Sequence, residues 1–463
     1  MTKLKIAFFL TLLPLFGVAQ KDYDITFWIK DFEDSIIYIK GAYGKDIIVL
    51  DSIKQGKDQS FIWKAKKQVP RVLTVSSRLE DMFSFILDTA TRFAIGIEPS
   101  GFYWVEGCEA NEHYLDYQNQ NRKIRLAEYE YKLQINNDKQ LNKDSVRHLY
   151  NTAYAAWETF SEEFYRLYPT NIMSVLVNSL KAPVVDDTFI VDGKLREGME
   201  SEYAYYFRSH YWDDFAFNDE RILYTPFFFQ RFESYVNKIT AQNSDSIFIC
   251  LKEFCETALA KGGKLYASYI LNYYLNHYSR MPFSFNERTY VLLVDFVSKT
   301  ASYYDIPPSE LNYHQTLANK VKPFLPGNRM PNVTAFDFSG AKQSLYDVKH
   351  KFTILYFWAA SCESCKQDLE VLEEFYRTKK DTFDVEIFSI DLEKDLNVGL
   401  TYHQQHPFEW IVLRSSPEEI EKRYGLDVEL TPELYILDQN KRILNKTVLY
   451  SQIEQSLKIL SQQ

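Results

Sequence analysis

Long apolar runs, clustered basic residues and cysteines are all scarce in this sequence of 463 residues. After the first 20 residues, no apolar stretch approaches the roughly 20 residues that cross a bilayer as a helix, which argues against a later membrane span. Lysine and arginine number 53 against 63 aspartate and glutamate, giving a formal charge of −10, and they form no cluster that could line up against phosphates. Nucleic acid and anionic membrane surfaces are therefore not expected partners.

The N-terminus is the exception to the shortage of apolar runs. It begins Met-Thr-Lys-Leu-Lys and continues as an apolar run from Ile6 to Ala19, with Gly17 close to its end. A basic start, a short apolar segment and small residues at its end predict a secretory signal peptide over residues 1–19. A retained membrane helix is the less favoured alternative, because the run is shorter than the roughly 20 residues that cross a bilayer. No cysteine follows the run, which disfavours a lipid anchor. We therefore expect an exported protein of the periplasm, with association with the cell envelope left open.

The five cysteines are an odd number, so an exported chain would keep at least one outside any internal pair. Cys250 and Cys255 lie five apart in a predicted helix, about 140° round its axis, so a bridge between them would distort the helix. Together with Cys108 they are predicted to be buried small hydrophobic side chains. Cys362 and Cys365 remain as the pair with Cys-x-x-Cys spacing.

The length predicts several domains, because single cores usually stop growing at roughly 250 to 300 residues. Over residues 20–110, short alternating apolar segments are broken by Gly, Asp, Lys and Pro, which predicts an antiparallel β-sandwich. Over residues 111–320, apolar residues recur at spacings of three and four, which predicts an all-α domain. A cluster of proline and glycine then opens a third predicted domain, residues 321–463.

This last domain alternates between buried strands and helices, which predicts an α/β layer with a central sheet. Cys362 directly follows the apolar strand "FTILYFW" and stands where the next helix begins, with Cys365 in its first turn. Unsatisfied N–H groups and the positive end of the helix dipole favour a thiolate at such a place. The spacing lets Cys365 close a disulfide that releases a partner bound to Cys362, which is the chemistry of thiol–disulfide exchange.

Residues 326–463 resemble the thioredoxin-fold domain of exported thiol–disulfide oxidoreductases of the TlpA/ResA type. The resemblance rests on "NVTAFDFSGAKQSLYDVKHKFTILYFWAASCESC", on "VEIFSIDL" and on "LTPELYILDQNKRIL". It implies a cis peptide between Thr431 and Pro432, with Pro432 facing the disulfide and the Thr431 backbone offered to an extended substrate. With Trp358, these two residues are expected to bind substrate; no cofactor and no metal are expected.

Asp368 lies three residues after the second cysteine, where members of that family often carry an acid. The resemblance implies a general base for Cys365, while a solvated acid that complements the helix dipole is an equal alternative. The sequence departs from the family at Ser361, Ser364 and Glu370, where tryptophan, proline and proline are usual. These departures leave both sulfurs in place and bear on the potential and direction of exchange.

The predicted function is reduction or isomerisation of disulfides in other exported proteins, with Cys362 attacking and Cys365 resolving the mixed disulfide. Expected partners are exported proteins with disulfides, cytochrome precursors among the candidates, and a membrane-borne electron donor. The order of a small β domain, a helical domain and a redox domain also resembles a layout known for exported thioredoxin-like proteins. Fold analogy assigns no activity to the first two parts.

Four alternatives compete with exchange as the role of this cysteine pair. Cys-x-x-Cys can be half of a zinc site, but there is no second such motif, and the near-paired histidines are His403 and His406. A purely structural disulfide across so short a loop would stabilise the fold weakly. Thiol peroxidases usually carry Pro and Thr shortly before the reactive cysteine, and "YFWAASC" has neither. A non-enzymatic periplasmic or surface binding protein with a lapsed thioredoxin-like domain is the second interpretation.

Overall fold

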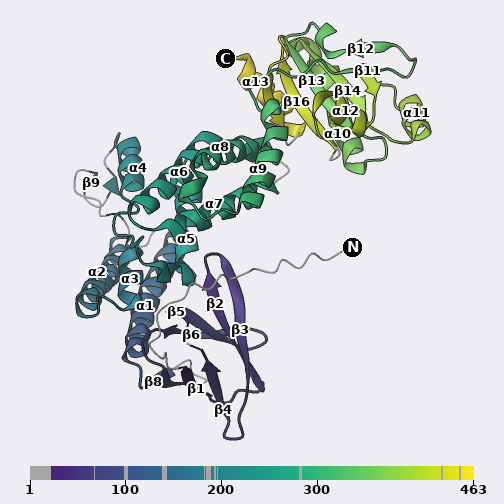
Figure 1. The fold of residues 1–463 in the computed structure, drawn as a ribbon. Helices are drawn as coiled ribbons and strands as arrows, with labels where there is room; N and C mark the ends of the chain where they lie inside the picture. Colours follow the sequence, from purple (N-terminus) through teal and green to yellow (C-terminus); the bar gives the residue numbers. More distant parts are fainter. Residues whose placement is uncertain are drawn as a thin grey trace. The chain divides into compact units, whose positions relative to one another are not determined.

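The computed structural model describes residues 22–66, 68–98, 103–137, 143–181, 183, 189–191, 194–195, 197–280, 284–428, 431–447 and 450–462 (Figure 1). The predicted signal peptide, residues 1–19, lies outside these ranges. The chain divides into two compact units, Met1–Ile239 and Thr240–Gln463. Within the described ranges, no helix is both long enough and apolar enough to span a membrane.

The first unit begins with the predicted β-sandwich. Its strands are β1 (Tyr23–Ile29), β2 (Ile36–Tyr43), β3 (Asp46–Lys54), β4 (Ser60–Ala65), β5 (Arg71–Ser76), β6 (Asp81–Leu87), β7 (Arg92–Ile97) and β8 (Tyr103–Glu106). They form two sheets of order β4-β1-β7-β8 and β3-β2-β5-β6. Alternate side chains such as Phe27, Ile39 and Phe85 point into one shared core, because successive residues of a strand face opposite sides. One pairing differs from the antiparallel expectation, since β1 and β7 run parallel.

Helices follow the sandwich in the first unit. They are α1 (Glu109–Asn137), α2 (Lys143–Leu167), α3 (Ile172–Ser179), α4 (Glu200–Ser209) and α5 (Phe227–Ser234), with a two-residue pairing of β9 (Ile190–Val191) and β10 (Lys194–Leu195). The side chain of Asn111 joins α1 to the sandwich. Its Oδ1 accepts from the Ile86 N–H at 2.7 Å and its Nδ2 donates to the Ile86 carbonyl at 2.8 Å. The buried amide thus takes the place of a neighbouring strand beside β6.

The second unit begins with four further helices, α6 (Ser244–Ala260), α7 (Lys264–Ser279), α8 (Ser284–Thr300) and α9 (Pro308–Val321). Cys250 and Cys255 are both buried in α6, and Cys108 is buried in the sandwich core. Burial raises the pKa of the Cys108 and Cys255 thiols, which makes them poor nucleophiles. The prediction that these three cysteines are buried is confirmed.

The rest of the second unit is the predicted α/β domain. Its elements are β11 (Thr334–Phe336), β12 (Lys342–Ser344), β13 (Phe352–Trp358), α10 (Glu363–Phe383), β14 (Val385–Asp391), α11 (Leu396–Gln405), β15 (Ile411–Arg414), α12 (Pro417–Tyr424), β16 (Glu433–Asp438), β17 (Ile443–Thr447) and α13 (Ile453–Ser461). The sheet order is β12-β11-β15-β14-β13-β16-β17, with β14 parallel and β16 antiparallel to β13. This mixed sheet with flanking helices is a thioredoxin-like fold, as predicted.

Strand β13 is the centre of this domain. All seven of its residues are buried, because each face of the sheet is covered by a core. On one face, Ile354 and Tyr356 pack with Leu369 of α10; on the other, Leu355 and Phe357 belong to a second core. A strand buried on both sides has the continuous apolar sequence of "FTILYFW", and its carboxyl end carries the cysteine loop.

Candidate redox site

The cysteine pair lies where β13 gives way to α10. Cys362 is the N-cap of α10, with the extended backbone (φ −84°, ψ 111°) that an N-cap requires. Its sulfur accepts a hydrogen bond from the Cys365 N–H, with nitrogen and sulfur 3.2 Å apart. This N–H is among the donors that a helix start leaves without a backbone partner, and it is directed at the atom that would carry the thiolate charge. The predicted strand–cysteine–helix placement is what the structure has.

Cys362 and Cys365 are joined as a disulfide with their Cα atoms 5.2 Å apart, within the usual range for such a bond. The two sulfurs differ in access. Cys362 is partly exposed at the helix start, whereas Cys365 is 0% exposed and packs with the core beneath α10. The Ser364 hydroxyl lies 3.3 Å from the Cys362 sulfur. A partner in solution can therefore reach Cys362, whereas Cys365 is shielded from solvent and bonded to Cys362.

Thr431 and Pro432 approach the same end of the sheet from β16. The peptide bond between them is cis, as the resemblance implied. Glu433, the next residue, pairs with Phe357 in the β13–β16 register. The Thr431–Pro432 step therefore continues β16 past the end of β13, where the cysteine loop begins. Both residues are partly exposed, and their role in binding an extended substrate stays a prediction.

Asp368 lies on α10, one turn beyond Cys365, and is half-buried. Burial raises the pKa of its carboxyl from the ordinary 3.8 to about 6. An acid in contact with solvent at the start of a helix would be expected to keep an ordinary or lowered pKa. The raised pKa of Asp368 is the property that a general base near neutral pH would need, and that role stays a prediction.

Trp358 does not have the exposure that its predicted role needs. Its side chain is 1% exposed, and its ring packs against Tyr402 at 5.6 Å and Phe408 at 5.8 Å between centroids. The cause is that β13 is buried along its whole length, including its last residue. The buried indole belongs to the core against which Cys362 packs. It is not available to a substrate in this structure.

Two carboxylates that the sequence analysis missed hold the loop before Cys362. The Ala360 N–H donates to Asp391 Oδ1 at 3.3 Å, and the Ser361 N–H donates to Glu393 Oε2 at 2.8 Å. Asp391 also accepts from the Glu393 N–H at 2.9 Å. The carboxyl ends of neighbouring parallel strands meet at one edge of a sheet, so the acid that ends "VEIFSID" was the available signal.

Their titration differs because their surroundings differ. Asp391 is 2% exposed, and burial raises its pKa to about 6 even though two backbone N–H groups oppose the shift. Burial also raises the pKa of Glu393, but hydrogen bonds from Ser361 and the neighbouring backbone outweigh it and lower the pKa overall. Asp391 is thus the buried group whose charge state is sensitive to pH beneath the cysteine loop.

The histidines considered for zinc do not form a ligand set with the cysteines. His403 stacks on Phe338 with ring centroids 4.5 Å apart, and His406 stacks on Tyr402 at 4.6 Å. Throughout the part of the chain that the structure describes, no three His, Cys, Asp or Glu side chains are grouped to hold a metal.

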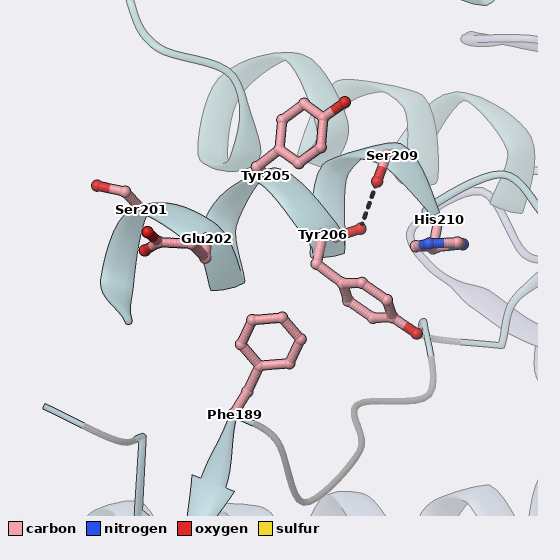
Figure 2. Close-up of a pocket in the computed structure, with 7 residues that line it drawn as sticks. All are labelled: Phe189, Ser201, Glu202, Tyr205, Tyr206, Ser209 and His210. Carbon is pink, nitrogen blue, oxygen red and sulfur yellow. Dashed lines mark hydrogen bonds between the residues drawn. The ribbon is translucent and has the colours of Figure 1, made fainter. Parts of the chain in front are cut away.

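A separate hollow lies in the first unit, along α4 (Figure 2). Phe189 and Tyr206 lie next to each other in its lining, with ring centroids 5.2 Å apart. The Ser209 hydroxyl donates a hydrogen bond to the Tyr206 carbonyl at 2.9 Å. The lining residues are Phe189, Ser201, Glu202, Tyr205, Tyr206, Ser209 and His210. Among the lining residues that the structure describes there is no cysteine, and the Ser209 hydroxyl is bonded to a carbonyl rather than to a base.

Comparison with known families matches two parts of the chain. Residues 326–446 match the AhpC/TSA family, and residues 198–320 match a domain of unknown function, DUF5106. The first match covers the cysteine pair, the Thr431–Pro432 step and the sheet that holds them. It confirms the predicted thioredoxin-like character of the C-terminal domain. The second match covers the helices that precede this domain.

Individual relatives match shorter or more distant parts. The thioredoxin-like protein YneN of Bacillus subtilis is 33% identical over 70 residues, which are 15% of this chain and 41% of that protein. The chain thus spans less than half of that relative. A thioredoxin-like protein from Bacteroides caccae is 19% identical over 61% of this chain and 98% of its own, with a TM-score of 0.48. The thioredoxin domain of a thiol-disulfide oxidoreductase from Bacteroides vulgatus is 20% identical over 28% and 97%, with a TM-score of 0.26.

Proposed function

Because residues 326–446 form a thioredoxin-like domain of the AhpC/TSA family, we propose that this protein is a thiol–disulfide oxidoreductase working through Cys362 and Cys365. The observation that carries the proposal is the unequal access of the two sulfurs. Cys362 is partly exposed at a helix start with an N–H group directed at it, and Cys365 is buried within bonding distance. Thiol–disulfide exchange needs one sulfur that meets the partner and one that displaces it.

In the first step, the Cys362 thiolate attacks one sulfur of a substrate disulfide. A bond forms between that sulfur and Cys362, the substrate disulfide breaks, and the second substrate sulfur leaves as a thiolate. In the second step, Cys365 loses its proton to Asp368 and attacks the Cys362 sulfur. The enzyme disulfide forms and the substrate leaves with both sulfurs reduced. A dithiol donor must then return two electrons to the pair.

Recognition of the substrate is assigned to the backbone beside the pair. An extended segment would lie along Thr431 and Pro432, which are partly exposed and come directly before β16. Such backbone contacts favour unfolded or extended protein segments, which suits reduction or isomerisation of disulfides in other proteins. We assign the protein to the periplasm, on the signal peptide predicted at residues 1–19, with exported proteins, cytochrome precursors among them, as substrates and a membrane-borne donor.

The test is thiol trapping of the mature protein across glutathione and dithiothreitol redox buffers, with the Cys362–Cys365 disulfide measured by mass spectrometry. We expect a reversible two-electron transition; a midpoint near roughly −270 mV would mark a reductant and one near roughly −120 mV an oxidant. Cys362→Ser should abolish exchange, and Cys365→Ser should accumulate the mixed disulfide. Cys250→Ser is the matched control, because it makes the same substitution at a cysteine outside the pair and keeps both sulfurs of the redox site.

Full activity of Cys362→Ser on a protein disulfide would refute the mechanism. Failure of the pair to form a disulfide reversibly would refute the enzymatic function, and the non-enzymatic binding protein would take its place. In that case the aromatic hollow along α4 would be the first surface to test for a ligand.

A further inference from the structure

A largely buried cluster of charges joins α8 to the strands that adjoin the redox site. Lys446 Nζ on β17 lies 2.9 Å from Glu287 Oε1 in the first turn of α8 and 2.7 Å from Glu433 Oε1 on β16. The three side chains are 14 to 15% exposed. Ion pairs on a surface contribute little, but breaking a buried pair leaves an uncompensated charge and is costly. Loss of any one of the three charges should therefore be costly to this contact.

Glu433 stands at the critical position in this cluster, directly after Pro432. Lys446 pairs with Tyr435 in the β16–β17 register, so Glu433, Tyr435 and Lys446 lie on the same face of the sheet. The Tyr435 hydroxyl donates to Glu433 Oε1 at 2.7 Å. The residue that follows the Thr431–Pro432 step is thus held by a lysine and a tyrosine, and the lysine is in turn held by α8.

The charges do not balance within the cluster, since two carboxyl groups share one ammonium group. Glu287 Oε2 is buried and has no hydrogen-bond partner among the residues that the structure describes. Burial raises the pKa of Glu433; burial lowers that of Lys446, but the two carboxylates outweigh this and raise it overall. A buried carboxylate oxygen without a hydrogen bond costs free energy. A contact that only joined two parts of the chain would not need this second carboxylate.

We propose that Glu287 is a positioning residue, through which the helical segment fixes, by way of Lys446 and Glu433, the Thr431–Pro432 backbone along which a protein substrate lies. This assigns a role to residues 198–320, which match a domain of unknown function. The inference rests on the proposed exchange activity, and it adds that the helical segment helps to select the substrate. Substitution of Glu287 should therefore impair reduction of protein disulfides and leave reduction of small disulfides unchanged. A small disulfide needs to reach Cys362 but does not need to lie along the Thr431–Pro432 backbone.

A second ion pair between the same two parts provides a matched control. Lys320 Nζ on α9 lies 3.0 Å from Glu421 Oε1 on α12, with side chains 50% and 44% exposed. This pair also joins the helical segment to the thioredoxin-like domain, but it involves neither β16 nor β17. Lys320→Ala therefore removes an ion pair between the same two parts without touching the cluster.

The experiment compares Glu287→Gln with Lys320→Ala in the full-length protein. We expect Glu287→Gln to raise KM for reduction of insulin about five- to tenfold, while kcat/KM for hydroxyethyl disulfide and the midpoint potential of the pair stay unchanged. Lys320→Ala should change none of these. Hydrogen exchange should quicken severalfold in residues 431–438 of Glu287→Gln and not in the control.

Equal effects of the two substitutions, or an equal loss on insulin and on hydroxyethyl disulfide, would overturn the proposal. An unchanged rate of hydrogen exchange in residues 431–438 would also overturn the proposal, whether or not the protein reduces insulin. If Glu287→Gln does not fold, Glu433→Gln serves in its place, with the same expected results and the same refutations. A wild-type pair with no reversible transition would instead refute the exchange activity, and the hydrogen-exchange comparison would still decide the role of Glu287.

Discussion

Asp391→Asn should make the protein more stable at neutral pH, although it removes a charge that accepts two hydrogen bonds. The Oδ1 atom that accepts from the Ala360 and Glu393 N–H groups has a counterpart in asparagine. What asparagine lacks is the ionisation of a side chain that is 2% exposed. Burying a carboxylate that no cation compensates costs free energy, and the neutral amide avoids that cost.

The magnitude follows from the pKa of Asp391, which burial raises from 3.8 to about 6 in the folded protein. Between these values the folded state binds more protons than the unfolded state, so stability falls as the pH rises through this window. A shift of about two units corresponds to about 3 kcal/mol in full, of which about 2 kcal/mol is lost between pH 4 and pH 7.

The assay is urea unfolding of wild type and Asp391→Asn, followed by circular dichroism at several pH values from 4 to 7.5. Other titrating groups are common to both proteins, so the difference between the two free energies of unfolding isolates Asp391. We expect that difference to move in favour of asparagine by about 2 kcal/mol across the range. A difference that is independent of pH, or that moves in favour of aspartate as the pH rises, would refute the reasoning.

Three further predictions concern the same loop and helix. Asp368→Asn should slow resolution of the mixed disulfide about 100-fold and remove an inflection near pH 6, measured by stopped-flow release of substrate thiol; Asp368→Glu should keep an inflection, and an unchanged profile in Asp368→Asn would exclude the base. Trp358→Ala should cost about 3 to 5 kcal/mol in urea unfolding, and Trp358→Phe distinctly less, because the buried indole N–H has no partner among the described residues; equal costs would contradict this. Gly399→Ala would bring a Cβ to 2.9 Å from Asp391 Oδ2, so it should cost about 1 to 3 kcal/mol and couple with Asp391→Ala in a double-mutant cycle; additive costs would show that the two positions are independent.

Much of the fold could be predicted because its signals are local. Short alternating apolar segments predicted the sandwich over residues 20–110, and among the residues described there eight strands form, from β1 to β8. The parallel pairing of β1 with β7 could not be predicted, because alternation marks which residues face the core but not which strand lies alongside. The three predicted domain boundaries remain predictions, since the helices are divided between two compact units.

The site residues that lie within short motifs could be predicted, and those that meet only through the fold could not. Cys362, Cys365 and the cis Thr431–Pro432 step are features that a few adjacent residues announce. Asp391 was missed because its partner, the Ala360 N–H, is 31 residues away and becomes its neighbour only through strand register. Glu287 and Lys446 are 159 residues apart, a separation at which no local pattern indicates contact.

The unequal burial of the two sulfurs also determines what an oxidant can do to this protein. A peroxide reaching the loop would meet Cys362 first and convert its thiolate to a sulfenic acid. Cys365, one helical turn away and shielded in the core, would condense with that sulfenic acid, expel water and leave the ordinary disulfide. The irreversible sulfinic and sulfonic acids form only when a sulfenic acid persists. The geometry that discharges a substrate therefore also protects the protein from permanent oxidative damage.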